Sequence, residues 1–392
     1  MFHRPHPQRD KFPTEPRAIP LLVFIHGLGG SVAQWHPLLT TIVDYADCLA
    51  VDLPGCGLSQ LDPKDWEAYT QKSLVHLLAT IIEHYRDKDH DQRVVLICHS
   101  MGCSLGTYLC SQTSPFAGPL SDKVDGMIAM CTLAEPPDAK QAQMARRVIS
   151  VLPVPIFNLW RALDRQGGVD SKSITRFTGD DADLETRRLQ LRFNRQSRSA
   201  TFLRMIYGCL ADYSSGIPVG GIPGESVWSG VKLPLFLVYG EADHITSPEN
   251  MLKIAAFLGK KATPQEKHNF DEKLDQQMSM ISVMKDKVVE MRELGPDAIS
   301  VPTHVEARSN AASVSLLEES SSDDRSTIPT IPQSGPPAFK TYIFPAPASH
   351  GLLYATQTVR PLSGFIQSFL SKHIDYRLSI DWQLQYLTSE AK

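Results

Sequence analysis

Long apolar runs are missing from this sequence: no stretch reaches the roughly 18 residues that a membrane-spanning helix requires. The N-terminal stretch MFHRPHPQRDKFPTEPR has no apolar core of the kind that a signal peptide contains. Its prolines and its acidic residues Asp10 and Glu15 also argue against an amphipathic transit peptide. We therefore expect no transmembrane segment and a cytoplasmic location.

Cysteine pairs and an excess of positive charge are lacking as well. The seven cysteines are an odd number and none of them forms a CxxC pair, which argues against a disulfide framework and against a zinc site. The formal net charge of −4 gives no reason to expect binding to nucleic-acid phosphates. Neither the lysine pattern of a P-loop nor the glycine pattern of a dinucleotide-binding turn occurs. The sequence therefore predicts no metal, no cofactor and no nucleic-acid partner.

What the chain does contain is an alternation of short apolar runs with patterns of helical spacing. This alternation is typical of an α/β fold with a mostly parallel sheet covered by helices on both faces. Between two of the runs, Leu74, Leu78, Ile81 and Tyr85 recur at helical spacing and predict one buried helix face. The expected strands are Leu21–Ile25, Cys48–Leu53, Val94–Cys98, Val124–Met130, Leu235–Tyr239 and Thr341–Phe344. Further helices are expected at Met101–Ser111, Pro248–Leu258 and Tyr354–His373, the last one bent at Pro361.

Two insertions interrupt this alternation. Residues 135–229 have a mainly helical pattern, whereas residues 260–338 begin with a charged, methionine-rich helical pattern. From Gly295 onward the Ser/Pro/acidic composition provides too little apolar surface for a core, so we expect disorder there. For this insertion we hypothesise regulation or a protein partner. The expected divisions are a disordered segment 1–18, a core of 19–134, 230–259 and 339–375, a helical insertion 135–229, the partly disordered insertion 260–338 and a C-terminal extension 376–392.

The strongest functional signal is VVLICHSMGCSLGTYL at residues 94–109, where a β-branched strand runs through Ser100 directly into a helix. A serine in so sharp a turn needs small residues two positions away on either side, and Cys98 and Gly102 meet this need. The pattern is the G-x-S-x-G nucleophile elbow with cysteine in place of the first glycine. It predicts that Ser100 is a nucleophile and that the backbone N–H of Met101 faces an oxyanion. The alternative is a chance small-x-Ser-x-Gly sequence in a buried turn.

A second signal is LLVFIHGLGGS at residues 21–31, an apolar strand that ends in His-Gly-x-Gly-Gly. Such a loop can turn so that a backbone N–H points at the same oxyanion, and we expect this donor to be Leu28. The alternative is a glycine-rich turn that cradles a phosphate.

Three motifs in this order resemble the α/β-hydrolase superfamily: HGLGG, DLPGCGLS at residues 52–59 and CHSMG at residues 98–102. Within it they resemble the branch of esterases, lipases and C–C hydrolases that carries a helical lid. The resemblance covers about residues 19–258 and 339–373. It implies an eight-stranded sheet and a lid after the sixth strand, where residues 135–229 fall. It also implies an acid after the seventh strand and a histidine after the eighth.

Both implied residues have candidates. LPLFLVYGEADHITSPE places Asp243 just past a strand end in a loop of the G-x-x-D-x-[IVT] form, with Glu241 or a purely structural turn aspartate as the alternatives. IFPAPASHGLLY places His350 in a turn before a helix. The resemblance implies that His350 takes the proton of Ser100 and that Asp243 orients the imidazole. We expect a packing role for His99, beside the nucleophile, and a structural one for Asp52.

The chain departs from the family pattern in two places. Only about 18 residues precede the first expected strand, so the two antiparallel strands with which the family opens are missing or very short, and we hypothesise a piece of a longer protein. In addition, the insertion 260–338 separates Asp243 from His350 by far more residues than in the family.

The leading hypothesis for function is hydrolysis of a carboxylic ester of a small molecule, with a lipophilic acyl group. Acyl transfer and cleavage of a thioester or peptide use the same residues, and a non-catalytic interaction protein on this scaffold is the alternative class. An epoxide or haloalkane hydrolase would need an aspartate in place of Ser100. Nine apolar residues of 135–229 are expected either to line an acyl pocket or to form the core of the insertion: Leu152, Ile156, Phe157, Leu159, Trp160, Phe202, Met205, Ile206 and Tyr207.

Overall fold

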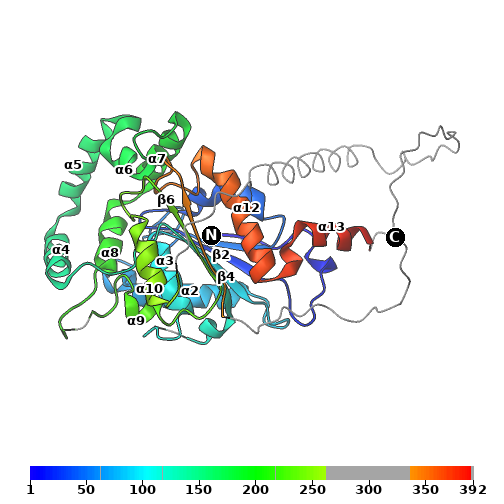
Figure 1. Cartoon of the computed structure of the whole chain (residues 1–392). Coiled ribbons are helices and arrows are strands. Elements are labelled where there is room, and N and C mark those ends of the chain that lie inside the picture. The colour runs from blue at the N-terminus through cyan, green and yellow to red at the C-terminus, as the bar shows by residue number, and fades with distance from the viewer. Residues whose placement is uncertain (62, 117, 217, 262–335, 390–392) are drawn as a thin grey trace, which may run out of the picture. The chain divides into compact units, whose positions relative to one another are not determined.

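The computed structural model describes residues 1–389 except for 62, 117, 217 and 262–335 (Figure 1). Its strands are β1 (Phe2–Arg4), β2 (Leu21–Ile25), β3 (Asp47–Val51), β4 (Val94–His99), β5 (Val124–Met130), β6 (Leu235–Gly240) and β7 (Phe339–Phe344). They form a seven-stranded sheet in the order β1-β3-β2-β4-β5-β6-β7. Strand β1 pairs antiparallel with β3, and the other neighbours are parallel. The expected α/β fold with a mostly parallel sheet is thereby confirmed.

The strand positions follow the apolar runs of the sequence closely. Strands β2 and β5 begin and end at the predicted residues, and β3, β4, β6 and β7 differ from the predictions by at most two residues at an end. Short apolar runs locate strands of a parallel sheet well because both faces of such strands are buried.

The N-terminal segment contradicts the sequence-based expectation of disorder for residues 1–18. Strand β1 forms an antiparallel ladder that pairs Phe2 with Ala50, and the backbone N–H of His6 donates to the Asp47 carboxylate at 2.7 Å. The described part of the sheet has seven strands instead of the implied eight, because one short strand precedes β2. A strand of three residues with a single apolar side chain, Phe2, is too short to show a periodic pattern, so periodicity could not locate it.

Helices cover both faces of the sheet. The core helices are α1 (His36–Ile42), α2 (Gln71–Tyr85), α3 (Met101–Cys110), α9 (Glu225–Trp228), α10 (Glu249–Phe257), α12 (Thr356–His373) and α13 (Ile380–Ser389). Along β2, Val23 packs into the core that α2, α3, α9 and α10 cover, whereas Phe24 packs into the core under α1 and α12. This alternation follows from the two-residue period of a strand. Short 3₁₀ turns are η1 (Arg9–Lys11), η2 (Val32–Trp35), η3 (Glu67–Tyr69), η4 (Pro119–Lys123), η5 (Gly168–Asp170) and η6 (Tyr376–Leu378).

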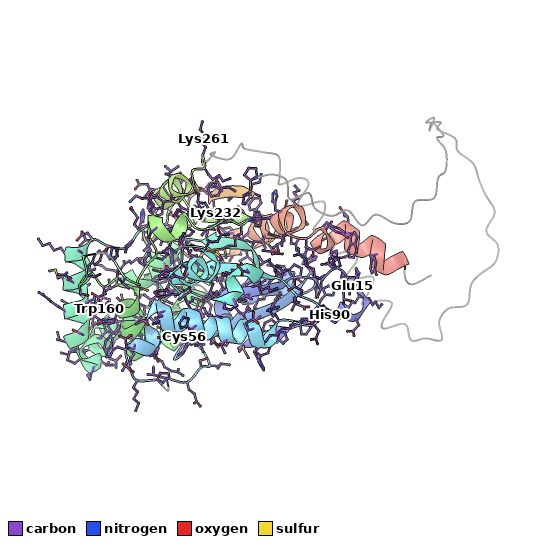
Figure 2. All side chains as sticks on the ribbon, turned by 90° about the horizontal axis from the view of Figure 1, so that it is seen from below. Glu15, Cys56, His90, Trp160, Lys232 and Lys261 are labelled. Atoms are coloured by element: carbon purple, nitrogen blue, oxygen red, sulfur yellow. The ribbon has the colours of Figure 1, made fainter. Side chains whose placement is uncertain are left out.

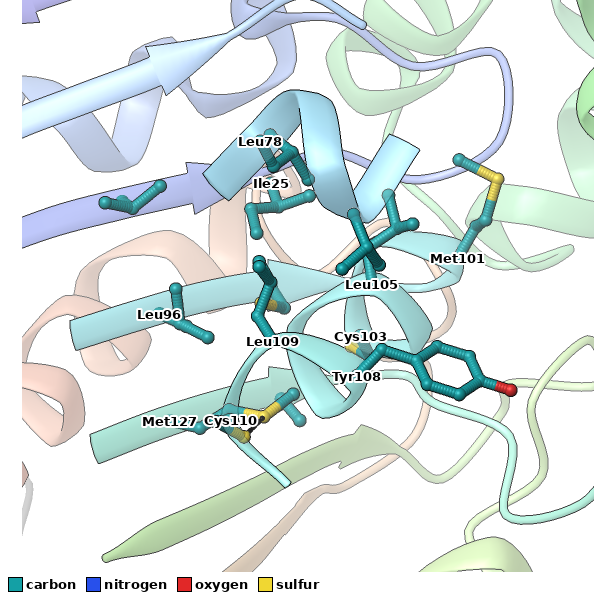
Figure 3. Close-up of a cluster of buried hydrophobic side chains, with 14 of the residues drawn as sticks. Ile25, Leu78, Leu96, Met101, Cys103, Leu105, Tyr108, Leu109, Cys110 and Met127 are labelled. Atoms are coloured by element: carbon teal, nitrogen blue, oxygen red, sulfur yellow. Dashed lines mark hydrogen bonds between the residues drawn. The ribbon is translucent and has the colours of Figure 1, made fainter. Parts of the chain in front are cut away.

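Helix α3 is buried along its whole length and fixes the position of the turn that precedes it (Figure 3). Leu105 and Leu109 face Ile25 and Leu96 in the core on this side of the sheet. Burial of a leucine side chain stabilises the fold by about 2 kcal/mol, so the start of α3 is held firmly. On neighbouring α2 the buried apolar positions are Leu74, Val75, Leu78 and Ile82, while Ile81 and Tyr85, also predicted on the buried face, are half-buried.

The insertion at residues 135–229 is helical, as its pattern predicts. It contains α4 (Ala139–Val151), α5 (Val154–Arg165), α6 (Lys172–Thr178), α7 (Leu184–Gln196) and α8 (Ser199–Cys209), followed by an isolated bridge between Asp212 and Val219. These helices lie together on one side of the molecule in Figure 1. The predictions for Lys260–Ala338 fall almost entirely on residues 262–335, which lie outside the described residues. Within the described ranges, no helix is both long and apolar enough to cross a bilayer.

Candidate active site

Ser100 occupies the sharp turn between β4 and α3. Its backbone has φ 53° and ψ −123°, in a region that a residue with a Cβ rarely adopts, and its N–H donates to the Met130 carbonyl at 2.9 Å. Such strain persists only where the surrounding packing imposes it, and it is a known feature of functional sites. The turn lifts the side chain of Ser100 out of the strand at the N-terminus of α3.

The small residues around Ser100 are required by close contacts. A Cβ on Gly102 would lie 2.2 Å from the Ile25 carbonyl oxygen, so a larger residue does not fit there. Cys98 is fully buried, and its Sγ would lie 2.6 Å from a Cβ on Gly106 one turn further along α3. The cysteine that replaces the usual first glycine is accommodated because α3 has its own glycine opposite it.

The structure brings Ser100, His350 and Asp243 together although they are far apart in the sequence. His350 Nε2 lies 3.0 Å from Ser100 Oγ, and His350 Nδ1 lies 2.9 Å from Asp243 Oδ2. The side chains of His350 and Asp243 are almost completely buried, whereas Ser100 is half-buried. Asp243 follows β6 and His350 follows β7, at the carboxyl ends of neighbouring parallel strands, where ligands bind in open α/β sheets.

Asp243 is held by a set of donors that favour its ionised form. The backbone N–H groups of Ile245 and Thr246 donate to Oδ1 at 2.8 and 2.9 Å, and the Thr246 hydroxyl donates to Oδ2 at 2.6 Å. Burial by itself would raise the pKa of Asp243, but these bonds and the hydrogen bond and charge of His350 outweigh it and hold the pKa below its usual range. An ionised Asp243 fixes Nδ1–H on His350, which leaves Nε2 free to accept a proton from Ser100.

Thr246 is a site residue that sequence reasoning missed. Its Oγ1 contacts both Asp243 and, at 3.3 Å, His350 Nδ1. A hydroxyl residue three positions after an aspartate is a common local capping pattern, which was the available signal. Glu241, the alternative acid, is exposed and accepts the N–H of Ala346 at 2.9 Å.

His99, the last residue of β4, lies next to His350 inside the protein. Its Nε2–H donates to the His350 backbone carbonyl at 2.9 Å, and its ring packs edge-on against Trp35. Burial, with a smaller effect from the charge of His350, lowers the pKa of His99 to about 3. His99 is therefore neutral at physiological pH and holds the backbone of the turn that carries His350.

The HGLGG loop passes directly beside the serine. A Cβ on Gly27 would lie 2.8 Å from Ser100 Cβ. Within the described chain no oxygen accepts the backbone N–H of Leu28 or of Met101, so both donors remain free for a ligand. The loop is held by His26, which donates from Nδ1 to the Gly27 carbonyl at 2.7 Å and accepts the Leu53 N–H at 3.0 Å.

Asp52 ties the DLPGCGLS turn to the HGLGG loop. Its carboxylate accepts the N–H of Val32 at 2.7 Å and the N–H of Leu58 at 3.1 Å. These two bonds agree with the structural role expected for Asp52. They also keep the loop that carries Leu28 in a fixed position relative to Ser100.

The helical insertion lies over this site. The Phe177 ring packs edge-on against His350 with centroids 5.3 Å apart, and the Phe177 carbonyl accepts the Gly351 N–H at 3.1 Å. On the other side, Phe202 would lie 2.9 Å from a Cβ on Gly29. Aromatic side chains of the insertion therefore flank the groups around Ser100.

The expectation that the nine apolar residues of the insertion form a pocket or its core was wrong for Ile156, Leu159 and Trp160. All three are exposed, and α5 has no fully buried residue. Met205 is fully buried, and Phe157 and Phe202 stack with centroids 5.9 Å apart. The sequence shows that α5 is amphipathic but not which of its faces meets the core.

One group of donors near the site has a spacing that a metal could use: atoms of His99, Cys131 and His350 lie within 4.8 Å of one another. Both ring nitrogens of His350 already contact Ser100 and Asp243. Burial raises the pKa of the Cys131 thiol well above its usual value, which opposes the thiolate that a metal needs. These residues therefore serve the Ser100 site, and their arrangement does not favour a metal.

The sheet order, the strained turn at Ser100 and the histidine after the last strand define an α/β protein with a nucleophile elbow. Residues 20–272 match the family model described as alpha/beta hydrolase fold, and the chain belongs to this family. The resemblance inferred from the three motifs is thereby confirmed.

Two curated relatives and one solved structure illustrate the match. An abhydrolase domain-containing protein of Schizosaccharomyces pombe is 26% identical over 58% of this chain and 58% of its own length. Lipid droplet hydrolase 1 of Saccharomyces cerevisiae is 26% identical over 48% of this chain and 54% of its own length. The chain thus spans about half the length of the curated relatives it matches. The structure of a putative aryl esterase from Burkholderia cenocepacia aligns with a TM-score of 0.50 over 94% of each chain at 15% identity, which shows the common fold.

The lowered pKa of His99 predicts a pH dependence of stability. In the range between its ordinary value of 6.5 and its folded value of about 3, the unfolded chain binds a proton that the folded protein does not. The free energy of unfolding must therefore fall as the pH decreases below 6.5. From about pH 6 to about pH 5, the wild type should lose about 1 kcal/mol more than His99→Asn. Urea unfolding at both pH values measures this difference; equal losses would contradict the buried, neutral His99.

Proposed function

We propose that this protein is a serine hydrolase that cleaves a carboxylic ester of a lipophilic small molecule through an acyl-enzyme intermediate. The observation that carries the proposal is the hydrogen-bonded series from Ser100 through His350 to Asp243, with distances of 3.0 and 2.9 Å. An imidazole between a hydroxyl and a buried carboxylate is the arrangement that activates a serine. The strained turn at Ser100 supports the same role.

In this mechanism Ser100 Oγ attacks the ester carbonyl carbon while its proton passes to His350 Nε2. The carbonyl electrons move to the oxygen, and the N–H groups of Leu28 and Met101 stabilise the resulting oxyanion. Asp243 stabilises the imidazolium that has formed on His350. When the carbonyl re-forms, the bond to the alcohol oxygen breaks and His350 gives its proton to the leaving alcohol. Water then attacks the acyl-Ser100 ester by the same steps, which releases the acid and restores the serine.

A lipophilic substrate is supported by the surroundings of Ser100. Phe177 and Phe202 of the insertion flank His350 and the HGLGG loop. The name of the relative Lipid droplet hydrolase 1 agrees with such a substrate. All seven cysteines are free and six of them are buried, which fits a reducing compartment and supports a cytoplasmic location. We regard residues 135–229 as the lid of the site.

The experiment combines covalent labelling with a substrate series. A fluorophosphonate probe should phosphonylate the folded protein at Ser100, and tandem mass spectrometry locates the modified residue. Heat-denatured protein is the control and should remain unlabelled, because only the assembled site activates the hydroxyl. With p-nitrophenyl esters from acetate to dodecanoate, kcat/KM should rise with acyl length. A folded protein that is neither labelled nor active would favour the non-catalytic interaction protein.

Acyl transfer, thioester cleavage and peptide cleavage would use the same Ser100, His350 and Asp243. They differ in which nucleophile accepts the acyl group or which group leaves. Adding glycerol to the ester assay and separating the products distinguishes transfer from hydrolysis: free acid as the main product indicates hydrolysis, and an acylglycerol indicates transfer. Thioester and peptide substrates assayed beside the esters distinguish the leaving groups.

A further inference from the structure

Helix α5 of the lid turns its apolar face away from the protein. Ile156, Leu159, Trp160 and Leu163 recur at helical spacing on one side, and between 56% and 63% of each residue is exposed. In Figure 2, Trp160 lies at the outer edge of the molecule. A surface helix of a globular protein normally buries this face, so its exposure marks an interaction site.

Helix α4, which precedes α5, has the same property. Met144, Val148 and Val151 share one side of the helix, and between 55% and 77% of each residue is exposed. Together the two consecutive helices form what we call the lid face: these three residues of α4 and the four exposed apolar residues of α5. Both helices lie at the margin of the structure in Figure 1.

Arginines fasten the opposite sides of both helices to the rest of the lid. On α4, Arg146 donates to the Leu210 carbonyl at 2.9 Å and lies 4.2 Å from the centre of the Tyr207 ring. On α5, Arg161 donates to the carbonyls of Ser197 and Asn194 at 2.9 and 2.8 Å. The usual orientation of an amphipathic helix is thus reversed, with charge inward and apolar residues outward. These bonds fix the orientation, so the exposure is a property of the folded lid.

The charge of this region differs in sign from that of the whole chain. Apart from the inward Arg146 and Arg161, residues 139–178 contain five Lys or Arg and two Asp or Glu, whereas the complete chain has a net charge of −4. An apolar helix face with flanking basic residues and a tryptophan is the combination that binds a phospholipid surface with anionic headgroups. In a dimer of two lid faces the flanking basic residues of the two copies would repel each other, which disfavours a second copy as the occupant.

The lid face is also connected to the site. Trp160 stacks on Phe157 with centroids 5.7 Å apart, and Phe157 stacks on Phe202, which contacts the HGLGG loop at Gly29. A protein held on a lipid surface by α4 and α5 would therefore have the groups around Ser100 close to that surface.

We propose that the lid face docks on a phospholipid surface that contains anionic headgroups. The docking surface follows from exposure and charge alone, and its purpose, to take lipophilic esters from that surface, rests on the proposed function. Docking requires no bond cleavage, so the Ser100→Ala protein should bind as the wild type does. This separates a failure of docking from a failure of the proposed hydrolysis.

The test is sedimentation with vesicles of phosphatidylcholine containing about one third phosphatidylserine, at about 0.1 M salt. The double variant Leu159→Ser/Trp160→Ser should bind at least about 10-fold more weakly than the wild type. The matched control is Val219→Ser/Leu252→Ser, which removes two equally exposed apolar residues outside the lid face and should bind as the wild type. Hydrolysis of soluble p-nitrophenyl acetate should stay within about threefold in both variants. Circular dichroism should show that both double variants fold.

Three results would overturn the proposal. One is a wild type that remains in the supernatant with these vesicles. Another is a lid-face variant that sediments as well as the control. The third is a wild type that is dimeric by light scattering while Leu159→Ser/Trp160→Ser is monomeric, since a second copy would then cover the lid face. Equal binding to pure phosphatidylcholine vesicles would overturn the requirement for anionic headgroups.

Discussion

Ser100→Ala should abolish ester hydrolysis and leave the fold and its thermal stability nearly unchanged. Ser100 is half-buried at the turn, and its hydroxyl is hydrogen-bonded to His350. Alanine has the same Cβ as serine, so the strain at φ 53° is retained and no cavity is created. The loss in kcat should be several orders of magnitude, with a residual rate about 10³-fold above water from the oxyanion donors and binding.

The measurement is p-nitrophenyl butyrate hydrolysis by purified protein, with thermal unfolding followed by circular dichroism. Ser104→Ala is the matched control, because Ser104 lies one turn further along α3 and is buried. It should keep most of the activity. If Ser100→Ala turns over the ester as fast as the wild type and as fast as Ser104→Ala, the proposed nucleophile is wrong.

The elements that the sequence predicted well are those whose environment has a simple pattern. Strands β2 and β5 are buried on both faces, and their bounds follow directly from their apolar runs. Helix α3 begins where the glycine-containing turn ends, which the elbow motif specifies. Strand β1 could not be predicted because its three residues are held by a ladder to β3 and by the contact of His6 with Asp47, which periodicity does not reveal.

The candidate site divides in the same way. Ser100, Asp243 and His350 each stand in a local motif at the end of a strand, so their types and order were available from the sequence. The contact of Thr246 with Asp243 is local, but the contacts of Thr246 and His99 with His350 join segments that are far apart in the sequence, and these depend on the folded geometry. The outward direction of the apolar face of α5 was also inaccessible, because hydrophobic periodicity indicates a face and not what covers it.

His350→Ala should lower activity as severely as Ser100→Ala, because the imidazole is the base that the described part of the chain places in contact with Ser100 Oγ. Asp243→Asn should lose less activity. Its kcat should stay roughly one to two orders of magnitude above that of His350→Ala, since a badly oriented imidazole still acts as a base. The matched control is His99→Asn, which removes the bond to the His350 carbonyl but leaves both ring nitrogens of His350 in contact with Ser100 and Asp243. It should retain most of the activity.

The comparison of the two histidines separates a catalytic role of His350 from a structural one, because both histidines are buried and their rings lie 4.9 Å apart. A purely structural explanation predicts similar damage from either change, accompanied by lower thermal stability. The proposed mechanism predicts that His350→Ala loses kcat with a normal unfolding temperature and that its Ser100 is no longer labelled by the fluorophosphonate probe. His99 is unsuited to be the base, because its pKa of about 3 and its bond to a carbonyl keep it from accepting a proton. A His99→Asn protein that folds but is less active than His350→Ala would show that the base is assigned to the wrong histidine.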